Sequence, residues 1–515
     1  MRQKRETLHT MYDFSPSLPP RSPRRDPERP EPVSSAALEG IFRRCADFEC
    51  RRLRVGGEEG DALFICWLDG LISAAEAAES VLRPLGDPLR FPPELRADAE
   101  AVFTALLSGA LSCPSAQERG SLDALCEDLT HGRCAVVSDA LGRAVSFDVK
   151  SSFVRAVGEP TLEKSLKGSR DSFVESLRAN TALVRRHAAT PRLKIAESTL
   201  GRRSHTRVAV LFLEGAADPA VVRELAERLE RIDADSLVSL GPLEEQLVDR
   251  PLSPFPQLLH TEKPDRLAVW LLDGRVGLLV DGIPIALAMP VTFAGFMTVT
   301  GDGSMHRLVV TMLTALRYLA LLLGMYLPAL YAAVASFHRE MIPTRLLLSI
   351  MEAKRDVPFS TAAELVGMLI AFALLQEAGL RLPNPVGDTV SIIGALIVGQ
   401  AAVEARLVSP IAIIVVAGSG IACYAMPSQD MGSALRLCRA LFLLAAIGAG
   451  LYGVALASCL VAAHLASIDS FGVNYTAPLS GEAPFALARL LLPQPKSARA
   501  GRSALRKTSD KRRQA

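Results

Sequence analysis

The sequence lacks the short motifs by which catalytic and nucleotide-binding sites are commonly recognised. It has no GxGxxG after a predicted strand, no GxxxxGK[ST] and no GxSxG. Its 8 histidines are scattered, without the spacing of metal ligands. We therefore expect neither an enzyme nor a metal or other cofactor. Basic residues are mixed with acidic ones throughout the first three hundred positions, so nucleic-acid binding is not expected.

Disulfide and zinc signatures are also missing. The 9 cysteines are an odd number, and no two of them form a CxxC pair. We expect reduced thiols that act as small apolar side chains. The first dozen residues contain no apolar stretch, so no secretory signal is expected. Both absences favour a cytoplasmic location for the N-terminal half.

Charge is unevenly distributed, although the whole chain is nearly neutral at +2. Charged residues crowd the first three hundred positions and the last thirty, and they are sparse between 308 and 467. A single globular core does not separate charge in this way. We predict a multi-pass α-helical membrane domain preceded by a cytoplasmic soluble region of α+β class with α/β-like local order.

The soluble region shows strand and helix patterns in alternation. Strands are expected at 63–68, 135–137, 144–147, 208–213 and 237–240, and helices at 74–82 and 173–186. Asp218 and Pro219 predict the start of a further helix. Two Asp-Gly turns divide 267–288 into a predicted three-stranded meander. Because this meander directly precedes the apolar segments, we expect it to couple the soluble region to the membrane.

Five stretches approach or exceed the roughly 20 apolar residues that a membrane span needs. They are 318–336, 362–379, 386–405, 410–426 and 435–466. The last is long enough for one tilted helix, or for two short helices broken near Gly448, Gly450 and Gly453. Residues 341–357 mix apolar and charged side chains and are expected to lie along the interface. The basic tail from 489 onward favours cytoplasmic ends, which requires an even number of crossings, four or six.

The predicted helix at 386–405 carries a stripe of mostly small residues. The stripe consists of Gly387, Ser391, Gly394, Val398, Ala401 and Ala405, and a second face carries Ile393, Ile397, Gln400 and Glu404. Small residues let helices pack closely in lipid, and the same stripe can line a narrow pore, so both interpretations stay open. Our candidates for a pore or gate are Ser391, Gly394, Val398, Gln400 and Glu404.

Ionisable residues within the predicted spans form a second group of candidates, Glu364, Glu377 and Arg381. A charge inside a span usually meets a partner or water. Glu377 and Arg381 are four residues apart and can pair on a continuous helix. Glu404 either serves an ion path, a gate or an inter-subunit bond, or forms an ion pair with Arg406 or Arg381.

Several long motifs resemble those of the GerA-type spore germination proteins. They are PFPQ at 254–257, TEKPD at 261–265, VDGIP at 280–284, LPALY at 327–331, FHREMIPT at 337–344, EAGLRLP at 377–383, GALIVGQAAVEA at 394–405 and SFGV at 470–473. The resemblance covers roughly residues 40 to 480. It implies a component of the inner membrane of a bacterial endospore, either a germinant receptor A subunit or a member of the related branch encoded with the SpoVA proteins.

The family resemblance also implies partners and an activity. A subunits of this family act with a transporter-like B subunit that binds nutrients and with a lipoprotein C subunit. The resemblance implies that they form a homo-oligomeric, signal-gated channel that releases ions when a germinant binds. The alternative is a non-conducting scaffold that couples the nutrient-binding subunit to the germination machinery.

These expectations divide the chain into segments. They are a disordered tail at 1–35, soluble subdomains at 36–150 and 151–260, the linking meander at 261–300, the transmembrane domain at 301–480 and a basic cytoplasmic tail at 481–515.

Overall fold

The computed structural model describes residues 32–54, 62–87, 89–92, 98–111, 113, 115–150, 163, 168–237, 239–299, 301–302, 305–381 and 399–477. The chain divides into two compact units. Unit 1 comprises Met1–Arg43 and Phe48–Ser151, and unit 2 comprises Arg44–Asp47 and Ser152–Ala515.

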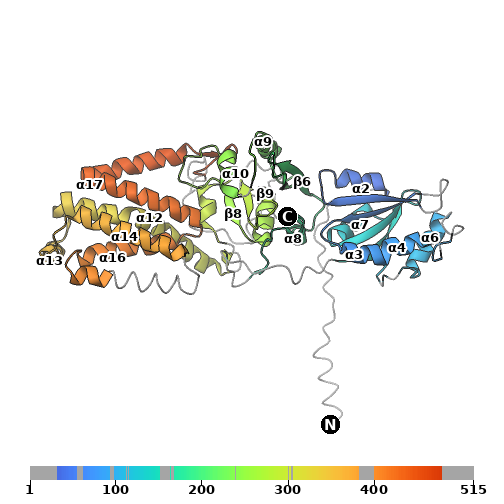
Figure 1. Ribbon diagram of the computed structural model, residues 1–515, viewed down its shortest axis with the longest axis horizontal. Helices are drawn as coiled ribbons and strands as arrows, with labels where there is room; N and C mark the ends of the chain where they lie inside the picture. Colours follow the sequence, from blue (N-terminus) through green and yellow to red (C-terminus); the bar gives the residue numbers. More distant parts are fainter. Residues whose placement is uncertain are drawn as a thin grey trace, which may run out of the picture. The chain divides into compact units, whose positions relative to one another are not determined.

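Unit 1, drawn in blue to cyan in Figure 1, is built on an antiparallel sheet. The strand order in this sheet is β1-β2-β4-β5-β3. Its strands are β1 (Phe48–Arg54), β2 (Ala62–Leu68), β3 (Gln117–Arg119), β4 (Arg133–Ser138) and β5 (Arg143–Asp148). Its helical elements are α2 (Ser35–Ile41), α3 (Ala74–Ala77), the π-helical turn η1 (Ala78–Leu82), α4 (Arg83–Gly86), α6 (Ala99–Leu107) and α7 (Leu122–Thr130). The predicted pairing of 135–137 with 144–147 is confirmed, because Val136 lies opposite Val145.

The soluble part of unit 2 contains a second antiparallel sheet, with the order β6-β7-β9-β10-β8. Its strands are β6 (Leu193–Leu200), β7 (Thr206–Leu213), β8 (Leu259–Thr261), β9 (Val276–Val280) and β10 (Ala286–Met289). Its helices are α8 (Leu177–His187), α9 (Pro219–Glu230), α10 (Leu240–Leu247) and α11 (Pro264–Leu272).

Strand β7 shows how this sheet is buried on both faces. Ala209 and Leu211 belong to one apolar cluster together with residues of α8 and α11. Val208 and Val210 belong to another cluster together with residues of α9 and α10. Successive side chains of a strand point to opposite faces, so an apolar run such as 208–213 indicates helices on both sides.

Two of the predicted strands are wrong. Residues 267–272 belong to helix α11, which begins at Pro264, and residue 240 starts helix α10 rather than ending a strand. The buried positions Leu267, Ala268 and Leu271 have helical spacing, but a short apolar run does not distinguish the two structures. The first Asp-Gly turn therefore ends a helix, where Gly274 has a φ of 89°, and only the second joins two strands of the sheet.

A helix bundle follows the second sheet in unit 2 (Figure 1). Its members are α12 (Arg307–Phe337), α13 (Thr344–Lys354), α14 (Thr361–Arg381), α16 (Pro410–Tyr424) and α17 (Gln429–Ala466). Among the described residues, 3 helices are long and apolar enough to cross a membrane, Arg307–Phe337, Thr361–Ala378 and Gln429–Ala466. The predicted segment 410–426 forms the shorter helix Pro410–Tyr424. Only the end of the predicted helix at 386–405 is described, and it is helical at 399–404.

Helix α17 is folded back on itself as a hairpin. Its backbone leaves the helical region at Ala449 and at Gly450, which has a φ of 57°. A Cβ atom added to Gly453 would lie 2.0 Å from the carbonyl oxygen of Ala445. In a straight helix, residues this far apart along the chain are about 12 Å apart. Of the two arrangements left open for 435–466, the structure has two helices, and Figure 1 shows both arms.

Tyr326 of α12 contacts both arms of this hairpin. Its ring centroid lies 4.6 Å from that of Phe442 in the first arm. Its hydroxyl donates a hydrogen bond of 3.0 Å to Ser458 Oγ in the second arm. Phe442 and Ser458 are equally distant from Gly450 in sequence, as expected for a reversal at that residue.

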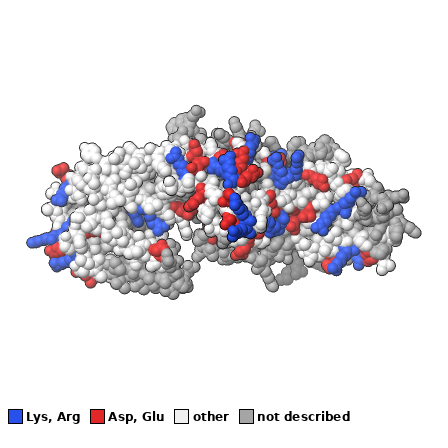
Figure 2. Space-filling view, turned by 45° about the horizontal axis from the view of Figure 1, so that its top comes forward, with Lys and Arg blue, Asp and Glu red and all other residues white. Residues whose placement is uncertain are grey.

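The surface of the bundle is mostly free of charge in the view of Figure 2, whereas Lys, Arg, Asp and Glu crowd the soluble region. Leu308, Met312, Leu319 and Leu322 of α12 are among the large apolar side chains that are exposed. An apolar outer surface of this kind is suited to lipid rather than water. The chain is thus a membrane protein with an α+β soluble region, as the sequence predicts.

Candidate coupling site at the base of the helix bundle

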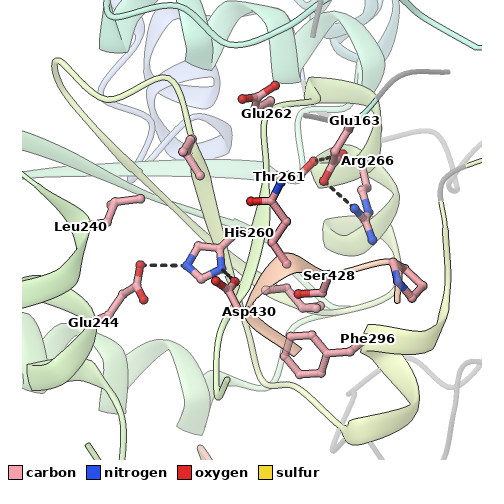
Figure 3. A pocket seen from close by; sticks show the side chains of 14 residues that line it. Glu163, Leu240, Glu244, His260, Thr261, Glu262, Arg266, Phe296, Ser428 and Asp430 are labelled. Carbon is pink, nitrogen blue, oxygen red and sulfur yellow. Dashed lines mark hydrogen bonds and ion pairs between the residues drawn. The ribbon is translucent and has the colours of Figure 1, made fainter. Parts of the chain in front are cut away.

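A cavity of about 280 Å³ lies where the second sheet meets the loop between α16 and α17 (Figure 3). Strand β8, helices α10 and α11, and the start of α17 all contribute to its walls. The lining residues are Glu163, Leu240, Glu244, Leu259, His260, Thr261, Glu262, Arg266, Ile285, Phe296, Pro427, Ser428, Gln429 and Asp430. The cavity therefore lies between the soluble part of unit 2 and its membrane helices, and both contribute to its walls.

His260 bridges two carboxylates in the wall of this cavity (Figure 3). Its Nε2 atom lies 2.8 Å from Glu244 Oε1, and its Nδ1 atom lies 2.9 Å from Asp430 Oδ2. Burial lowers the pKa of His260, but hydrogen bonds to Asp430 and Glu244 outweigh this effect and raise it to about 9. At neutral pH the ring is thus an imidazolium that donates a hydrogen bond to each carboxylate.

Local structure holds the three members of this bridge in place. His260 lies in edge strand β8, opposite Leu287 of β10. Glu244 lies in α10, whose side chains Leu243 and Leu247 are buried. Asp430 lies in the first turn of α17, where Ser428 provides the N-cap and a negative charge is stabilised by the helix dipole. The bridge therefore connects a sheet edge, a surface helix and the start of a membrane hairpin.

Glu163 and Arg266 form a second ion pair at this cavity. Arg266 Nη1 lies 2.6 Å from Glu163 Oε1, and Thr261 Oγ1 donates a hydrogen bond of 2.9 Å to Glu163 Oε2. The guanidinium of Arg266 also stacks over the ring of Trp270 at 4.8 Å. These contacts fix the start of helix α11 beside strand β8.

The two ends of α17 contact the same region in the soluble part of unit 2. His464 Nε2 lies 2.8 Å from Ser253 Oγ, and the rings of His464 and Phe255 are 6.1 Å apart. Beyond α17, Tyr475 donates a hydrogen bond of 2.9 Å to the carbonyl oxygen of Pro256. Both ends of the hairpin are thus attached to residues 253–260, within and beside the motifs that carry the family resemblance.

Glu364 lies at the end of the bundle opposite to this cavity, and polar contacts hold its carboxylate in place. It is 3% exposed, and its Oε2 atom accepts hydrogen bonds from the backbone N–H (3.1 Å) and hydroxyl (2.8 Å) of Ser409. Its Oε1 atom lies 3.0 Å from Lys354 Nζ. Ser409 is the N-cap of α16, so this carboxylate joins α13, α14 and α16.

The predicted pore candidates are only partly described. Ser391, Gly394 and Val398 lie outside the described residues, as does the side chain of Arg381. Gln400 and Glu404 lie one helical turn apart, and both are exposed on the single chain. Arg406, one of the two partners considered for Glu404, forms an ion pair with Asp356 at 2.6 Å. Glu377 is exposed on α14.

The bridge was not predicted from the sequence, in which the histidines are scattered and lack the spacing of metal ligands. His260, Glu244 and Asp430 have no diagnostic spacing, since their elements are far apart in the chain. Arg439 of α17 was not among the predicted candidates either; it is buried and donates a hydrogen bond of 3.2 Å to Ser419 Oγ. The available signal was two arginines, Arg436 and Arg439, inside a mostly apolar span.

Comparison with known proteins places these motifs in context. Residues 36–504 match the family described as Bacillus/Clostridium GerA spore germination protein. Spore germination protein KA of Bacillus subtilis is 34% identical over 467 residues, which is 90% of this chain and 84% of that protein. Spore germination protein B1 of Bacillus subtilis is 38% identical over 351 residues, covering 68% of this chain and 73% of that protein.

One solved structure is also similar to the soluble part. It is the N-terminal domain of the A subunit of the Bacillus megaterium spore germinant receptor GerK3, at 24% identity and a TM-score of 0.39. The similarity covers 50% of this chain and 93% of that structure.

Proposed function

Because the chain belongs to the GerA family of spore germination proteins, we propose that it is the channel-forming membrane subunit of a germinant receptor. In this proposal, several copies assemble in the spore inner membrane and open an ion path when a germinant is bound. A transporter-like B subunit binds the nutrient, and a lipoprotein C subunit completes the complex.

The exposure of Gln400 and Glu404 carries this proposal. Both side chains are exposed. The surface of the bundle is mostly free of charge in the view of Figure 2 and exposes large apolar side chains. An amide and a carboxylate are poorly accommodated by lipid tails and usually face water or a partner. A water-filled path between copies of the chain satisfies both groups, and the small residues predicted at 387–398 allow those copies to pack closely.

The hairpin supports a topology with both chain ends on one side of the membrane. Helices α12, α14 and α16, the two arms of α17 and the predicted helix at 386–405 together make six crossings. An even number agrees with the contacts that both ends of α17 make with the soluble part of unit 2. Following the positive-inside tendency, we assign that side to the cytoplasm.

The His260 bridge supplies a route by which the soluble region acts on the membrane helices. A displacement of β8 or α10 changes the distances to Asp430 and therefore the position of the first arm of α17. Since α17 packs on α12 through Tyr326, the displacement reaches the centre of the bundle. Signal-dependent opening needs such a two-state connection between sites.

The test is ion release from spores that carry substitutions at the exposed polar positions. Glu404→Gln, Gln400→Leu and Gly394→Leu are compared with Glu340→Gln, which changes an exposed carboxylate outside this helix. Altered rate or selectivity of ion release at normal protein level supports the channel. If release changes only when the protein itself is lost, the scaffold is the better description.

A further inference from the structure

Two cysteine sulfur atoms lie against each other in unit 1, far along the chain from the membrane helices. The Sγ atoms of Cys50 in β1 and Cys66 in β2 are 2.9 Å apart, and both residues are free thiols. The two residues are directly opposed in the antiparallel register of β1 and β2. Their separation in sequence has no CxxC pattern, so the pair becomes visible only in the folded sheet.

The backbone geometry is compatible with a bond between these sulfurs. Opposed residues of an antiparallel pair have Cα atoms about 4.5–5.5 Å apart, and disulfides span about 4.4–6.8 Å. Closing the present sulfur–sulfur distance to a bond of about 2.05 Å needs a movement of less than about 1 Å. Rotation of the two side chains provides such a movement without rearranging the strands.

The two thiols differ in access and in acidity. Cys50 is half-buried, whereas Cys66 is completely buried. The hydrogen bond between the two thiols lowers the pKa of Cys50, against the opposing effects of burial and of the carboxylates of Glu39 and Asp139. The same contact, together with burial, raises the pKa of Cys66. Cys50 is therefore the thiol that reacts first, and Cys66 is the partner that follows.

We propose that Cys50 and Cys66 form a redox site that a hydroperoxide converts into an intramolecular disulfide. The Cys50 thiolate attacks one peroxide oxygen, which breaks the O–O bond, gives a sulfenic acid and releases water or an alcohol. The Cys66 sulfur then attacks the Cys50 sulfur, the S–S bond forms and the hydroxyl group leaves as water. In total, two thiols lose two electrons and two protons, and the peroxide is reduced.

The consequence is a covalent link at the edge of the first sheet. Within the described part of the chain, strand β1 is the edge strand of the order β1-β2-β4-β5-β3 and pairs with β2. A disulfide between the two strands prevents β1 from separating from β2 while it is intact. Oxidation thus stabilises this sheet without contributing any group to the proposed ion path.

The experiment uses the full chain in membranes with the exposed Cys459 replaced by serine, which removes a thiol able to link separate copies. The reduced protein is treated with hydrogen peroxide, labelled with N-ethylmaleimide after denaturation, digested and analysed by mass spectrometry. We expect a cross-linked peptide containing Cys50 and Cys66, lighter by two hydrogens than its two parts. Both thiols should be lost at least about tenfold faster than the buried Cys134 thiol.

Variants separate the two steps. Cys66→Ala should stop the reaction at sulfenic or sulfinic acid on Cys50, and Cys50→Ser should leave Cys66 reduced. Treatment of the parent protein should also raise the melting temperature of unit 1 by several degrees, and dithiothreitol should reverse this. Full labelling of both thiols after peroxide, or over-oxidation of Cys50 beside an intact Cys66, would overturn the proposal. The experiment on the parent protein is sufficient to test the proposal, so the test remains valid even if a variant misfolds.

Discussion

His260 Nδ1 and Asp430 Oδ2 lie 2.9 Å apart and join the edge strand of a soluble sheet to the first turn of a membrane hairpin. Glu244 holds the other ring nitrogen, so one imidazolium connects three elements. The same hairpin returns to the sheet domain through His464 and Ser253. These contacts therefore connect the soluble part of unit 2 to both ends of the hairpin.

Breaking this bridge should impair germination without loss of the protein. Asp430→Asn and Glu244→Gln each remove one charge-assisted hydrogen bond, and we expect each to slow germination severalfold by weakening the coupling. Glu245→Gln is the matched control, because Glu245 is the exposed neighbour of Glu244 on α10. Optical-density loss of spores, together with immunoblots, measures the effect. Normal germination of the Asp430 variant would exclude the bridge from signalling.

The bridge should also make stability depend on pH in a defined direction. The pKa of His260 is raised from its ordinary 6.5 to about 9 in the folded protein. The contribution of the charged ring to the free energy of unfolding is therefore complete below pH 6.5 and is lost as the pH rises toward 9. Its size is at most about 3 kcal/mol. The melting temperature of the detergent-solubilised protein should therefore fall across this window more steeply than that of His260→Gln. Parallel curves for the two proteins would contradict the assignment.

Gly450 should be needed for the reversal within α17. Its φ of 57° is unfavourable for other residues, and an added Cβ would lie 3.0 Å from Phe337 Cγ and 3.1 Å from His338 Cε1. We expect Gly450→Ala to destabilise the protein by about 1–3 kcal/mol. Gly448→Ala is the control, because its Cβ would meet no atom within 4 Å. Equal melting temperatures for the two variants would argue against the hairpin.

Glu364 should contribute to stability rather than to conduction. Glu364→Ala leaves Lys354 without its carboxylate and the N-cap of α16 without an acceptor, which should cost about 3 kcal/mol. Replacing Lys354 by Met in the same protein should recover part of this loss, as a double-mutant cycle would show. Glu352→Gln, on the exposed side of α13, serves as the control. A conduction defect with unchanged melting temperature would instead place Glu364 on the ion path.

Local patterns predicted the elements whose partners are close in sequence. The strands β4 and β5 pair across a short turn, and helix α9 starts at Asp218 and Pro219 as expected. The apolar segments 318–336 and 362–379 lie within α12 and α14. This was predictable, because about 20 consecutive apolar residues are typical of a membrane-spanning helix. Composition likewise separated the soluble region from the membrane region.

Where local signals were ambiguous, tertiary packing decided the outcome. Residues 267–272 form a helix in which Leu267, Ala268 and Leu271 cover one face of the second sheet. Strand propensity takes no account of this packing contact. At 435–466, where the sequence allowed one helix or two, the structure has two, and Tyr326 contacts both of them. A glycine permits a reversal at many places, and packing selects one of them.

The sequence by itself determined the class of this protein, its division into soluble and membrane regions, and its family resemblance, since these depend on composition and on contiguous motifs. Only the tertiary structure decided which polar groups meet. His260 with Asp430, Glu364 with Ser409, and Cys50 with Cys66 each unite residues from different elements. Hydrogen bonds and ion pairs act over a few ångströms in space, and no spacing along the chain reports that distance before the fold brings the elements together.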